Sequence, residues 1–178
     1  EAKTRQIIGS INDAPAQAIR VNTVLSTDEA VEQALLDEHF TFVKSKVADH
    51  AYVVTGGHVA GSKAYQDGLL TLQDESAMLP VEALQITTQV KTVLDAAAAP
   101  GGKTTQIAQY IADDATITAL DIHAHKIRLI EANAKRLHVS DKITAQVLDA
   151  RQTANQLTTK FDRILVDAPC SGFGLLRR

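Results

Sequence analysis

The 178-residue sequence has little sulfur and few aromatic side chains, with one cysteine, Cys170, one methionine, Met78, and no tryptophan. A single cysteine excludes an internal disulfide and a cysteine zinc cluster, and it predicts a reducing, cytoplasmic location. No apolar run approaches the roughly 18 residues of a membrane span, and no signal peptide is recognisable, so we expect no membrane partner. Aromatic residues make up 4% of the chain, which predicts a core built from Ala, Val, Leu and Ile.

The sequence also lacks a large excess of either charge. The chain has 18 Lys and Arg against 21 Asp and Glu, a net charge of −3, and only residues 91–178 have a basic excess, 12 against 9. The chain therefore lacks the overall positive charge of a typical nucleic-acid binder. Its six histidines show no metal-ligand spacing beyond His123 and His125, which we place at the start of a helix, and no metal is predicted.

The first part of the sequence predicts a small α+β domain over residues 1–66. Ser26 to Glu29 fits a capping box, with a hydroxyl at the N-cap and Glu at N3, in front of an amphipathic helix. Short β-like runs cover residues 18–21, 40–43, 51–54 and 69–72, and a second helical pattern covers residues 75–84. A boundary near residues 64–68 leaves residues 67–178 as a second domain.

From residue 90 onward, strands and helices alternate. Predicted strands cover residues 92–95, 116–120, 143–148 and 163–166, and predicted helices cover residues 103–111 and 125–137. This alternation predicts a doubly wound α/β fold with a parallel sheet. The four strands end in Asp95, Asp121, Asp149 and Asp167, and ligands of such sheets bind at the carboxyl ends of the strands. A nucleoside offers hydroxyl and amino groups to these acids; the alternative is that each aspartate caps the turn that follows it.

The loop after the first of these strands is rich in small residues. It consists of Ala97, Ala98, Ala99, Pro100, Gly101, Gly102 and Lys103, followed by Thr104. Small side chains let the backbone approach a ligand at the start of a helix. Gly102-Lys103-Thr104 also matches the second half of a P-loop, but Ala97 replaces the first glycine and Pro100 removes an amide. The loop therefore favours S-adenosylmethionine over ATP or NAD, with a P-loop-like NTPase as the alternative.

A cysteine follows the fourth strand, in the segment Asp167-Ala168-Pro169-Cys170. Next to a predicted nucleoside pocket, its position favours a thiol that takes part in the chemistry. The alternative is that Cys170 is a small buried apolar residue.

These segments resemble the RNA 5-methylcytosine methyltransferases, and most closely the bacterial 16S ribosomal RNA methyltransferase B family, also called Sun or Fmu. The matching segments are LDAAAAPGGK at residues 94–103, ALDIHAHKI around Asp121, VLDAR around Asp149, and FDRILVDAPCSGFGLLRR at residues 161–178. Arg20-Val21-Asn22 and GLLTLQDESAM at residues 68–78 resemble the family's small RNA-binding region and its link to the catalytic domain. The resemblance implies a Rossmann-like S-adenosylmethionine-dependent methyltransferase domain, of which this chain holds the first four strands.

The resemblance also implies roles for individual residues. Residues 97–103 would wrap S-adenosylmethionine, Asp121 would bind the ribose, and Asp149 would lie beside the adenine. Asp167 would lie near the methionine end and the target cytosine of 16S ribosomal RNA. In the family a cysteine attacks carbon 6 of the cytosine, carbon 5 takes the methyl group, and a second cysteine, matching Cys170, assists release.

The chain departs from the family in two ways. Ala97 stands where the family commonly has cysteine, a small change that should leave the loop able to bind. The attacking cysteine belongs to a Thr-Cys motif after the next strand, beyond Arg178, so we expect the chain to be a fragment that is inactive alone. A non-catalytic RNA-binding or assembly protein stays open as an alternative, and a monomer is favoured for the full enzyme. The basic helix surface with Lys126, Arg128, Lys135 and Arg136 is predicted to be solvated first and RNA-facing second.

Overall fold

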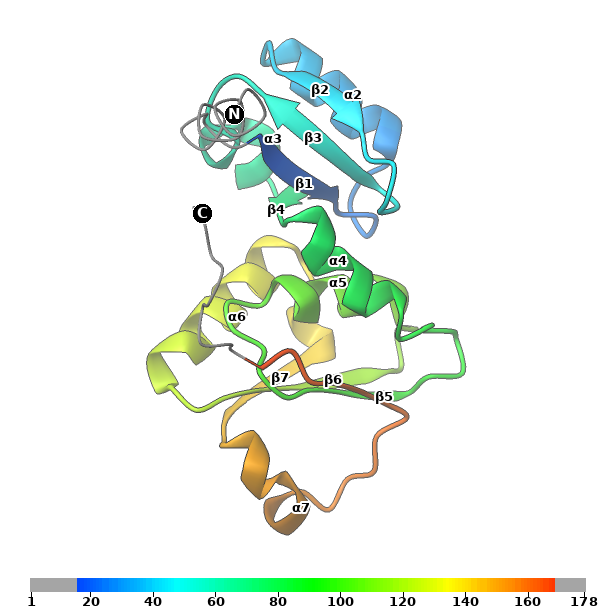
Figure 1. Ribbon diagram of the computed structural model, residues 1–178, viewed down its shortest axis with the longest axis vertical. Coiled ribbons are helices and arrows are strands. Elements are labelled where there is room, and N and C mark those ends of the chain that lie inside the picture. Colours follow the sequence, from blue (N-terminus) through cyan, green and yellow to red (C-terminus); the bar gives the residue numbers. More distant parts are fainter. Residues whose placement is uncertain (1–15, 169–178) are drawn as a thin grey trace, which may run out of the picture.

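Two β-sheets dominate the computed structural model, which describes residues 16–168. A four-stranded antiparallel sheet has the order β2-β3-β1-β4, and a four-stranded parallel sheet has the order β7-β6-β5-β8. We call the first sheet with its helices the small unit and the second sheet with its helices the large unit; they are stacked one above the other (Figure 1). The predicted α/β class with a parallel sheet is confirmed.

The small unit follows the predicted order of elements. Its strands are β1 (Gln17–Val21), β2 (Thr41–Lys44), β3 (Ala51–Thr55) and β4 (Leu70–Leu72), and its helices are α2 (Asp28–Asp37), the short 3-10 helix η1 (Val59–Gly61) and α3 (Lys63–Gln66). Val31 and Leu35 of α2 pack with Ile19 and Tyr52 in its core. The N-cap of α2 is Thr27 rather than Ser26, because the Thr27 hydroxyl accepts the Ala30 amide at 3.3 Å. Strand β4 pairs with β1 although it lies beyond residue 66.

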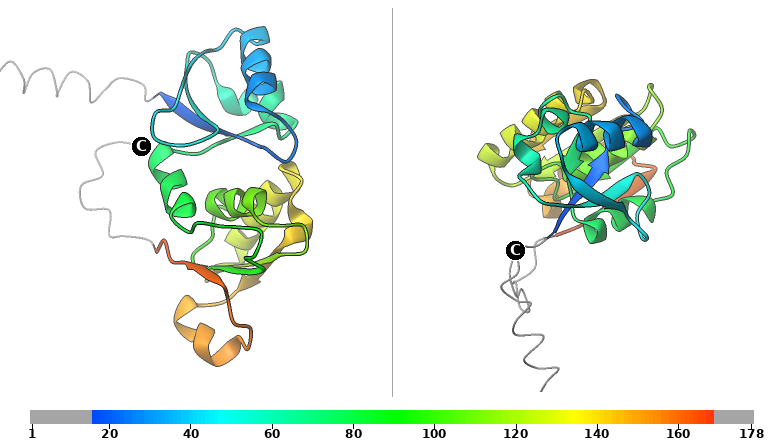
Figure 2. Two further views of the ribbon diagram at one scale, coloured as in Figure 1. Left: turned by 90° about the vertical axis from the view of Figure 1, so that its right-hand side faces the viewer. Right: turned by 90° about the horizontal axis from the view of Figure 1, so that it is seen from above.

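The large unit alternates strands and helices as predicted. After α4 (Glu75–Glu82), its strands are β5 (Thr92–Asp95), β6 (Thr116–Asp121), β7 (Ile143–Val147) and β8 (Arg163–Leu165), and its helices are α5 (Gly102–Tyr110), α6 (Ala124–Arg136), η2 (Ser140–Lys142), η3 (Ala150–Gln152) and α7 (Thr153–Gln156). Helices α5 and α6 cover the sheet face toward the small unit, and α7 lies on the opposite side (Figures 1 and 2). The helical turns η3 and α7 lie in a stretch for which the sequence predicted no helix.

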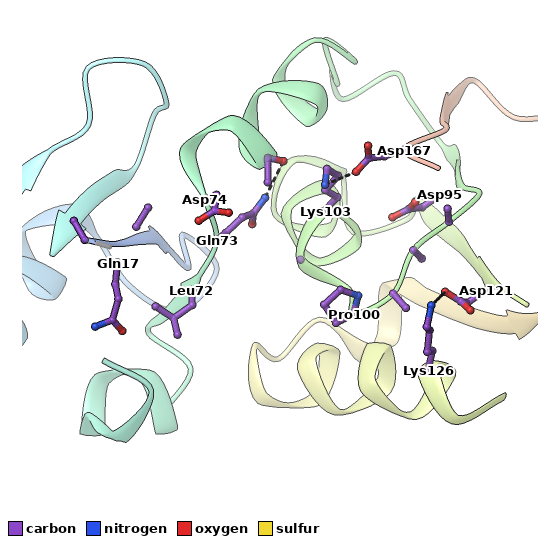
Figure 3. Close-up of a pocket in the computed structure, with 17 residues that line it drawn as sticks. Gln17, Leu72, Gln73, Asp74, Asp95, Pro100, Lys103, Asp121, Lys126 and Asp167 are labelled. Atoms are coloured by element: carbon purple, nitrogen blue, oxygen red, sulfur yellow. Dashed lines mark hydrogen bonds and ion pairs between the residues drawn. The ribbon is translucent and has the colours of Figure 1, made fainter. Parts of the chain in front are cut away.

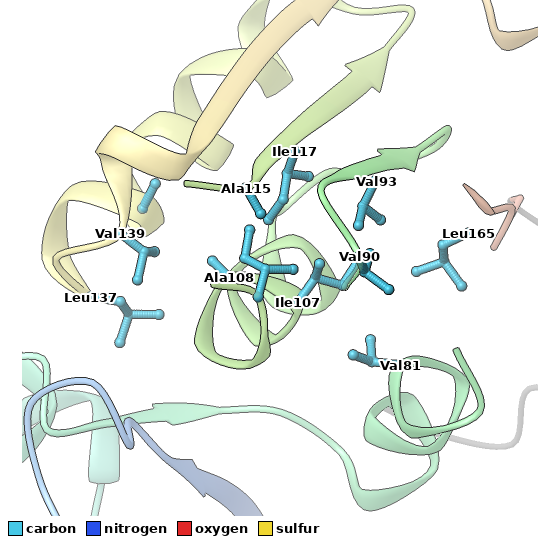
Figure 4. Close-up of a cluster of buried hydrophobic side chains, with 12 residues drawn as sticks. Val81, Val90, Val93, Ile107, Ala108, Ala115, Ile117, Leu137, Val139 and Leu165 are labelled. Carbon is cyan, nitrogen blue, oxygen red and sulfur yellow. The ribbon is translucent and has the colours of Figure 1, made fainter. Parts of the chain in front are cut away.

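The main core of the large unit is aliphatic, as the scarcity of aromatic residues predicts (Figure 4). Val93 of β5 and Ile117 of β6 pack against Ile107 of α5 on one face of the sheet. Leu94, the next residue of β5, points to the other face and packs with Leu120 in a separate cluster. Both faces of these central strands are therefore buried, which is typical of a parallel sheet covered by helices.

A hydrogen-bonded interface joins the two units. The Asn22 side-chain amide donates to the carbonyls of Gly68 at 2.8 Å and Leu137 at 2.9 Å. Arg136, at the end of α6, donates to the carbonyls of Tyr65 and Leu70 and to the Thr71 hydroxyl, at 2.8–3.0 Å. The prediction of a solvated or RNA-facing Arg136 is therefore wrong, because its guanidinium binds backbone carbonyls of the small unit. The sequence pattern predicted that Arg136 lies on a helix, but it could not predict which part of the chain packs against this residue.

Candidate functional site

A cavity of about 740 Å³ opens between the units at the carboxyl edge of the parallel sheet (Figure 3). Its lining residues come from β1, from the end of β4 and the start of α4, from the β5–α5 loop and the first turn of α5, from the ends of β5 and β6, from α6, and from the segment after β8. They are Ala16, Gln17, Ala18, Leu72, Gln73, Asp74, Ala77, Asp95, Ala97, Ala98, Ala99, Pro100, Gly102, Lys103, Asp121, Lys126 and Asp167. The strand order reverses between β5 and β8, and Asp95 and Asp167 flank that point. Open α/β sheets bind their ligands at this reversal.

The loop between β5 and α5 owes its conformation to one glycine. Gly101 has φ +105°, and a Cβ there would lie 3.2 Å from Cα of Ile130 on α6. The carbonyl of the preceding residue, Pro100, accepts a hydrogen bond from the Asn133 side-chain amide of α6 at 2.8 Å. The glycine thus lets the loop lie directly on α6. Gly101 itself does not line the cavity, unlike the other predicted residues of this loop.

Helix α5 begins at Gly102 with its first amides free of any side-chain cap, because its N-cap residue is Gly101. Gly102 and Lys103 of this first turn line the cavity. Unpaired amides and the positive end of the helix dipole favour oxygen acceptors and anionic groups at this position. The start of α5 can therefore bind a carboxylate or hydroxyl oxygen of a ligand.

Asp95 ends β5 at the base of the cavity and is 1% exposed. Its carboxylate accepts the Thr104 hydroxyl at 2.7 Å and the Ala97 amide. Burial raises the pKa of Asp95, and these two hydrogen bonds only partly oppose the increase. Asp95 therefore ties the start of α5 to the end of β5.

Asp121 ends β6 on the far wall of the cavity. Its Oδ1 accepts the His123 amide at 2.9 Å, and its Oδ2 lies 3.8 Å from Nζ of Lys126. The expectation that an acid caps its following turn is met here by one oxygen. The other oxygen faces the cavity beside a lysine, as Figure 3 shows.

Lys103 and Asp167 form an ion pair on one wall of the cavity, with 2.6 Å between Nζ and Oδ2 (Figure 3). The Lys103 side chain is 21% exposed and that of Asp167 is 52% exposed. The pair joins the first turn of α5 to the segment after β8. Asp95, Asp121 and Asp167 therefore meet at one cavity, as the strand ends predicted.

Asp149, the fourth predicted acid, does not line the cavity. Its carboxylate caps η3 by accepting the Arg151 amide at 2.9 Å, and it also binds the Arg151 guanidinium through both oxygens. The Arg151 side chain and then its amide lower the pKa of Asp149 to about 2. For this residue, the alternative of a capping aspartate describes the geometry.

Eight residues of the cavity wall, four of them polar, were missed by the sequence-based prediction. Lys126 had a local signal, since it follows Asp121 by five residues at the start of a helix. Gln17, Gln73 and Asp74 had none, because they reach the cavity only through docking of the small unit. Tertiary contact rather than motif defines this half of the wall.

Cys170 lies outside the described residues. Within residues 16–168, no cluster of three or more His, Cys, Asp and Glu side chains is arranged to hold a metal ion. Within the same range, every helix is too short or too polar to span a membrane.

The strand order, the glycine-shaped loop and the acids at the strand ends define a Rossmann-like α/β protein with its ligand cavity at the reversal of the sheet. The sequence model of one family, described as 16S rRNA methyltransferase RsmB/F, matches residues 82–178. The chain belongs to this family, which confirms the predicted resemblance.

Curated relatives extend the match across most of the chain. A probable ribosomal RNA small subunit methyltransferase B of Bacillus subtilis is 41% identical over 165 residues, 92% of this chain and 36% of the relative. A ribosomal RNA small subunit methyltransferase B of Cronobacter sakazakii is 33% identical over 97% of this chain and 40% of the relative. The chain thus spans well under half the length of these relatives.

Solved structures share the fold. A methyltransferase homologue from Pyrococcus horikoshii superposes with a TM-score of 0.83 and 29% identity, over 97% of this chain and 56% of that one. The match includes both units, because it spans nearly the whole chain. It confirms the Rossmann-like methyltransferase fold.

Proposed function

We propose that the protein transfers a methyl group from S-adenosylmethionine to carbon 5 of a cytosine in 16S ribosomal RNA. The observation that carries the proposal is the convergence of the β5–α5 loop with Asp121 and with the Lys103–Asp167 pair around one cavity. Membership of the family and the names of the curated relatives support ribosomal RNA as the substrate. The cytosine and its carbon 5 come from the resemblance of residues 161–178.

The described wall of the cavity suits S-adenosylmethionine in charge. It holds the carboxylates of Asp74, Asp95, Asp121 and Asp167 and the ammonium groups of Lys103 and Lys126. Acids outnumber lysines, which favours a donor with a sulfonium and an amino group over a nucleotide with several phosphates. The uncapped amides of α5 offer hydrogen bonds to the donor's single carboxylate.

Two of the remaining assignments follow from position, and the third, that of Asp149, rests on the resemblance, because Asp149 does not line the cavity. Asp121 accepts the ribose hydroxyls through the oxygen that faces the cavity, and Asp167 holds the amino group of the methionine end and the edge of the cytosine. Asp149 is assigned to the adenine amino group, for which its carboxylate must exchange Arg151 for the ligand. S-adenosylmethionine supplies the methyl group when it is bound.

The chemistry requires covalent activation of the base. Carbon 5 of cytosine is a weak nucleophile until a thiolate adds to carbon 6. The adduct then takes the methyl group at carbon 5, the carbon 5 proton is removed, and the thiolate leaves. The resemblance assigns the attack to a Thr-Cys motif beyond Arg178 and the release step to Cys170. The cytosine must be unstacked to enter the cavity.

The structure argues against the P-loop alternative at Thr104. A P-loop uses this hydroxyl on a magnesium ion, but here Thr104 is 0% exposed and its hydroxyl donates to Asp95 at 2.7 Å. Lys103, which stands at the position of the P-loop lysine, pairs with Asp167. An NTPase is therefore not proposed.

Calorimetric titration of the full-length protein tests the donor site. We expect S-adenosylhomocysteine to bind and ATP with magnesium not to bind. Asp121→Asn should weaken binding about tenfold or more, since hydrogen bonds to a charged group contribute roughly 1.5–3 kcal/mol. Asp114→Asn is the matched control, because Asp114 is an exposed aspartate that pairs with Lys91 ahead of β6. Binding of ATP alone would overturn the proposed donor.

Methyl transfer is tested separately on 16S ribosomal RNA. The full-length protein, S-adenosylmethionine and unmethylated RNA should give 5-methylcytosine at a single position, detected by bisulfite sequencing. Donor binding without any methyl transfer would support the non-catalytic alternative instead.

A further inference from the structure

A buried arginine of the small unit reaches the start of α5. Arg20 lies on β1 and is 1% exposed. Its Nη2 donates to the Gly102 carbonyl at 3.3 Å and to the Thr105 hydroxyl oxygen at 3.1 Å. Gly102 is the first residue of α5 and lines the cavity. One guanidinium therefore connects the small unit to the helix start at which the donor is proposed to bind.

The same guanidinium also fixes the link between the units. Its Nε donates to Oε1 of Gln73 at 2.9 Å, and its Nη1 donates to the Gln109 side-chain oxygen. Gln73 lines the cavity. Its side-chain amide donates hydrogen bonds to Oε1 of Gln106 at 2.7 Å and to the Ala77 carbonyl at 3.2 Å. Arg20 thus binds α5 directly, and it is connected to α4 through Gln73.

The partners of Arg20 among the described residues are all uncharged. Burial lowers the pKa of Arg20 to about 9, and the neighbouring Tyr110 and Arg136 shift this pKa in opposite directions, so the group keeps its charge at neutral pH. A buried charge without a counter-ion costs free energy, and an apolar residue of similar size is often as stable. Stability alone is therefore a poor reason for an arginine here.

We propose that Arg20 is a positioning residue for the donor site, which fixes the first turn of α5 and Gln73 so that the small unit completes the cavity. The β5–α5 loop is then held from two sides. Asn133 of α6 binds the Pro100 carbonyl, and Arg20 binds the Gly102 carbonyl. The inference rests on the proposed function for the identity of the ligand, but not for the effect on the loop.

The test compares two arginines in the full-length protein. Arg20→Met should weaken S-adenosylhomocysteine binding at least tenfold by calorimetry. It should also speed amide hydrogen exchange in residues 101–106 of the free protein. Arg136→Met is the matched control, because Arg136 also donates three hydrogen bonds across the interface but contacts no part of the loop. It should lower the melting temperature while changing the dissociation constant less than twofold.

Two further variants separate geometry from charge and guard against misfolding. Arg20→Lys keeps the charge but cannot reach several acceptors at once, so it should resemble Arg20→Met rather than wild type. If Arg20→Met does not fold, Thr105→Val serves instead. It removes one acceptor of Nη2 at nearly constant volume. It should weaken binding about threefold, which lies toward the lower end of what one neutral hydrogen bond contributes.

The outcomes distinguish the two proposals. If wild type does not bind S-adenosylhomocysteine, the proposed function fails, and exchange in residues 101–106 still decides the positioning role. If wild type binds and Arg20→Met, or Thr105→Val in its place, binds equally with unchanged exchange, the positioning role is overturned. Equal losses of affinity in Arg20→Met and Arg136→Met would also overturn it, because the interface as a whole would then be responsible.

Discussion

The hydrogen-bond partner of Thr104 determines the role of its side chain. In sequence, Lys103-Thr104 fits both a phosphate loop and a methyl-donor loop. In the structure the Thr104 hydroxyl is buried and donates to Asp95, so it is committed to tying α5 to β5. The aspartate is equally committed, since it also accepts the Ala97 amide. The pair belongs to the frame of the cavity.

Asp95 should make stability depend on pH in an unusual direction. Burial raises its pKa above the ordinary 3.8, so between these two values the folded protein holds a proton that the unfolded chain releases. The contribution of Asp95 is fully present below 3.8 and is lost as pH rises through the raised pKa. Urea unfolding of wild type and Asp95→Asn should therefore show the advantage of wild type shrinking as pH rises.

Asp162 provides a control of opposite sign. The backbone amides of Lys91 and Thr92 lower its pKa below 3.8, so its contribution is present above 3.8 and is lost as pH falls through the lower value. The advantage of wild type over Asp162→Asn should thus shrink on acidification. A difference between wild type and Asp95→Asn that grows with pH would contradict the assignment of a buried, destabilised carboxylate.

At the scale of elements, the sequence predicted what is local and periodic. The bounds of β5 agree residue for residue with the prediction over residues 92–95, and α6 is displaced by only one residue at each end. Strand β5 is a short buried apolar run, and α6 carries Ile127, Ile130 and Ala134 at helical spacing. Helix α7 was missed because four residues, Thr153–Gln156, are too short to show a helical period. None of its residues is buried, so burial leaves no apolar pattern in the sequence either.

The loop before β4 should tolerate no side chain at Gly68. A Cβ there would overlap the Arg136 carbonyl oxygen at the end of α6, and φ is +77°. We expect Gly68→Ala to cost at least about 3 kcal/mol in the free energy of unfolding, because backbone has to move on both sides of the interface. Chemical denaturation of the full-length protein measures this loss.

Gly56→Ala isolates the effect of the backbone angle. Gly56 has φ +80° but no atom within 4 Å of the position of a Cβ. Its substitution should cost only about 1 kcal/mol, the usual penalty for a left-handed alanine. Similar costs at both glycines would mean that the contact between the β4 loop and α6 is not tight.

At the scale of the whole molecule, motif order predicted the parallel sheet and the edge where its acids gather. It did not predict the wall supplied by Gln17 and Gln73 or the contacts of Arg20 and Arg136, since these join residues far apart in sequence. Each such contact depends on how the two sheets dock, and no local pattern encodes that. The cavity is consequently half predictable: the motif side from sequence, the small-unit side only from structure.

Asn22 should control whether the two units unfold together. Each unit has its own core, and Asn22 lies fully buried between them. Its amide donates to the carbonyls of Gly68 and Leu137, and its oxygen accepts the Gln109 amide at 2.8 Å. Asn22→Ala removes these three hydrogen bonds, which should cost about 3 kcal/mol of coupling between the units.

Amide hydrogen exchange of the full-length protein measures that coupling directly. In wild type, the slowest amides of β3 and of β6 should report the same opening free energy, since the units open as one. In Asn22→Ala the two values should separate, with the lower one in the unit that has the smaller core. Asn133→Ala removes a hydrogen bond within the large unit, to Pro100, and should leave the two values equal. If the values already differ in wild type, the two units do not open as one. If they stay equal in Asn22→Ala, cooperative opening has a source other than the contacts of Asn22.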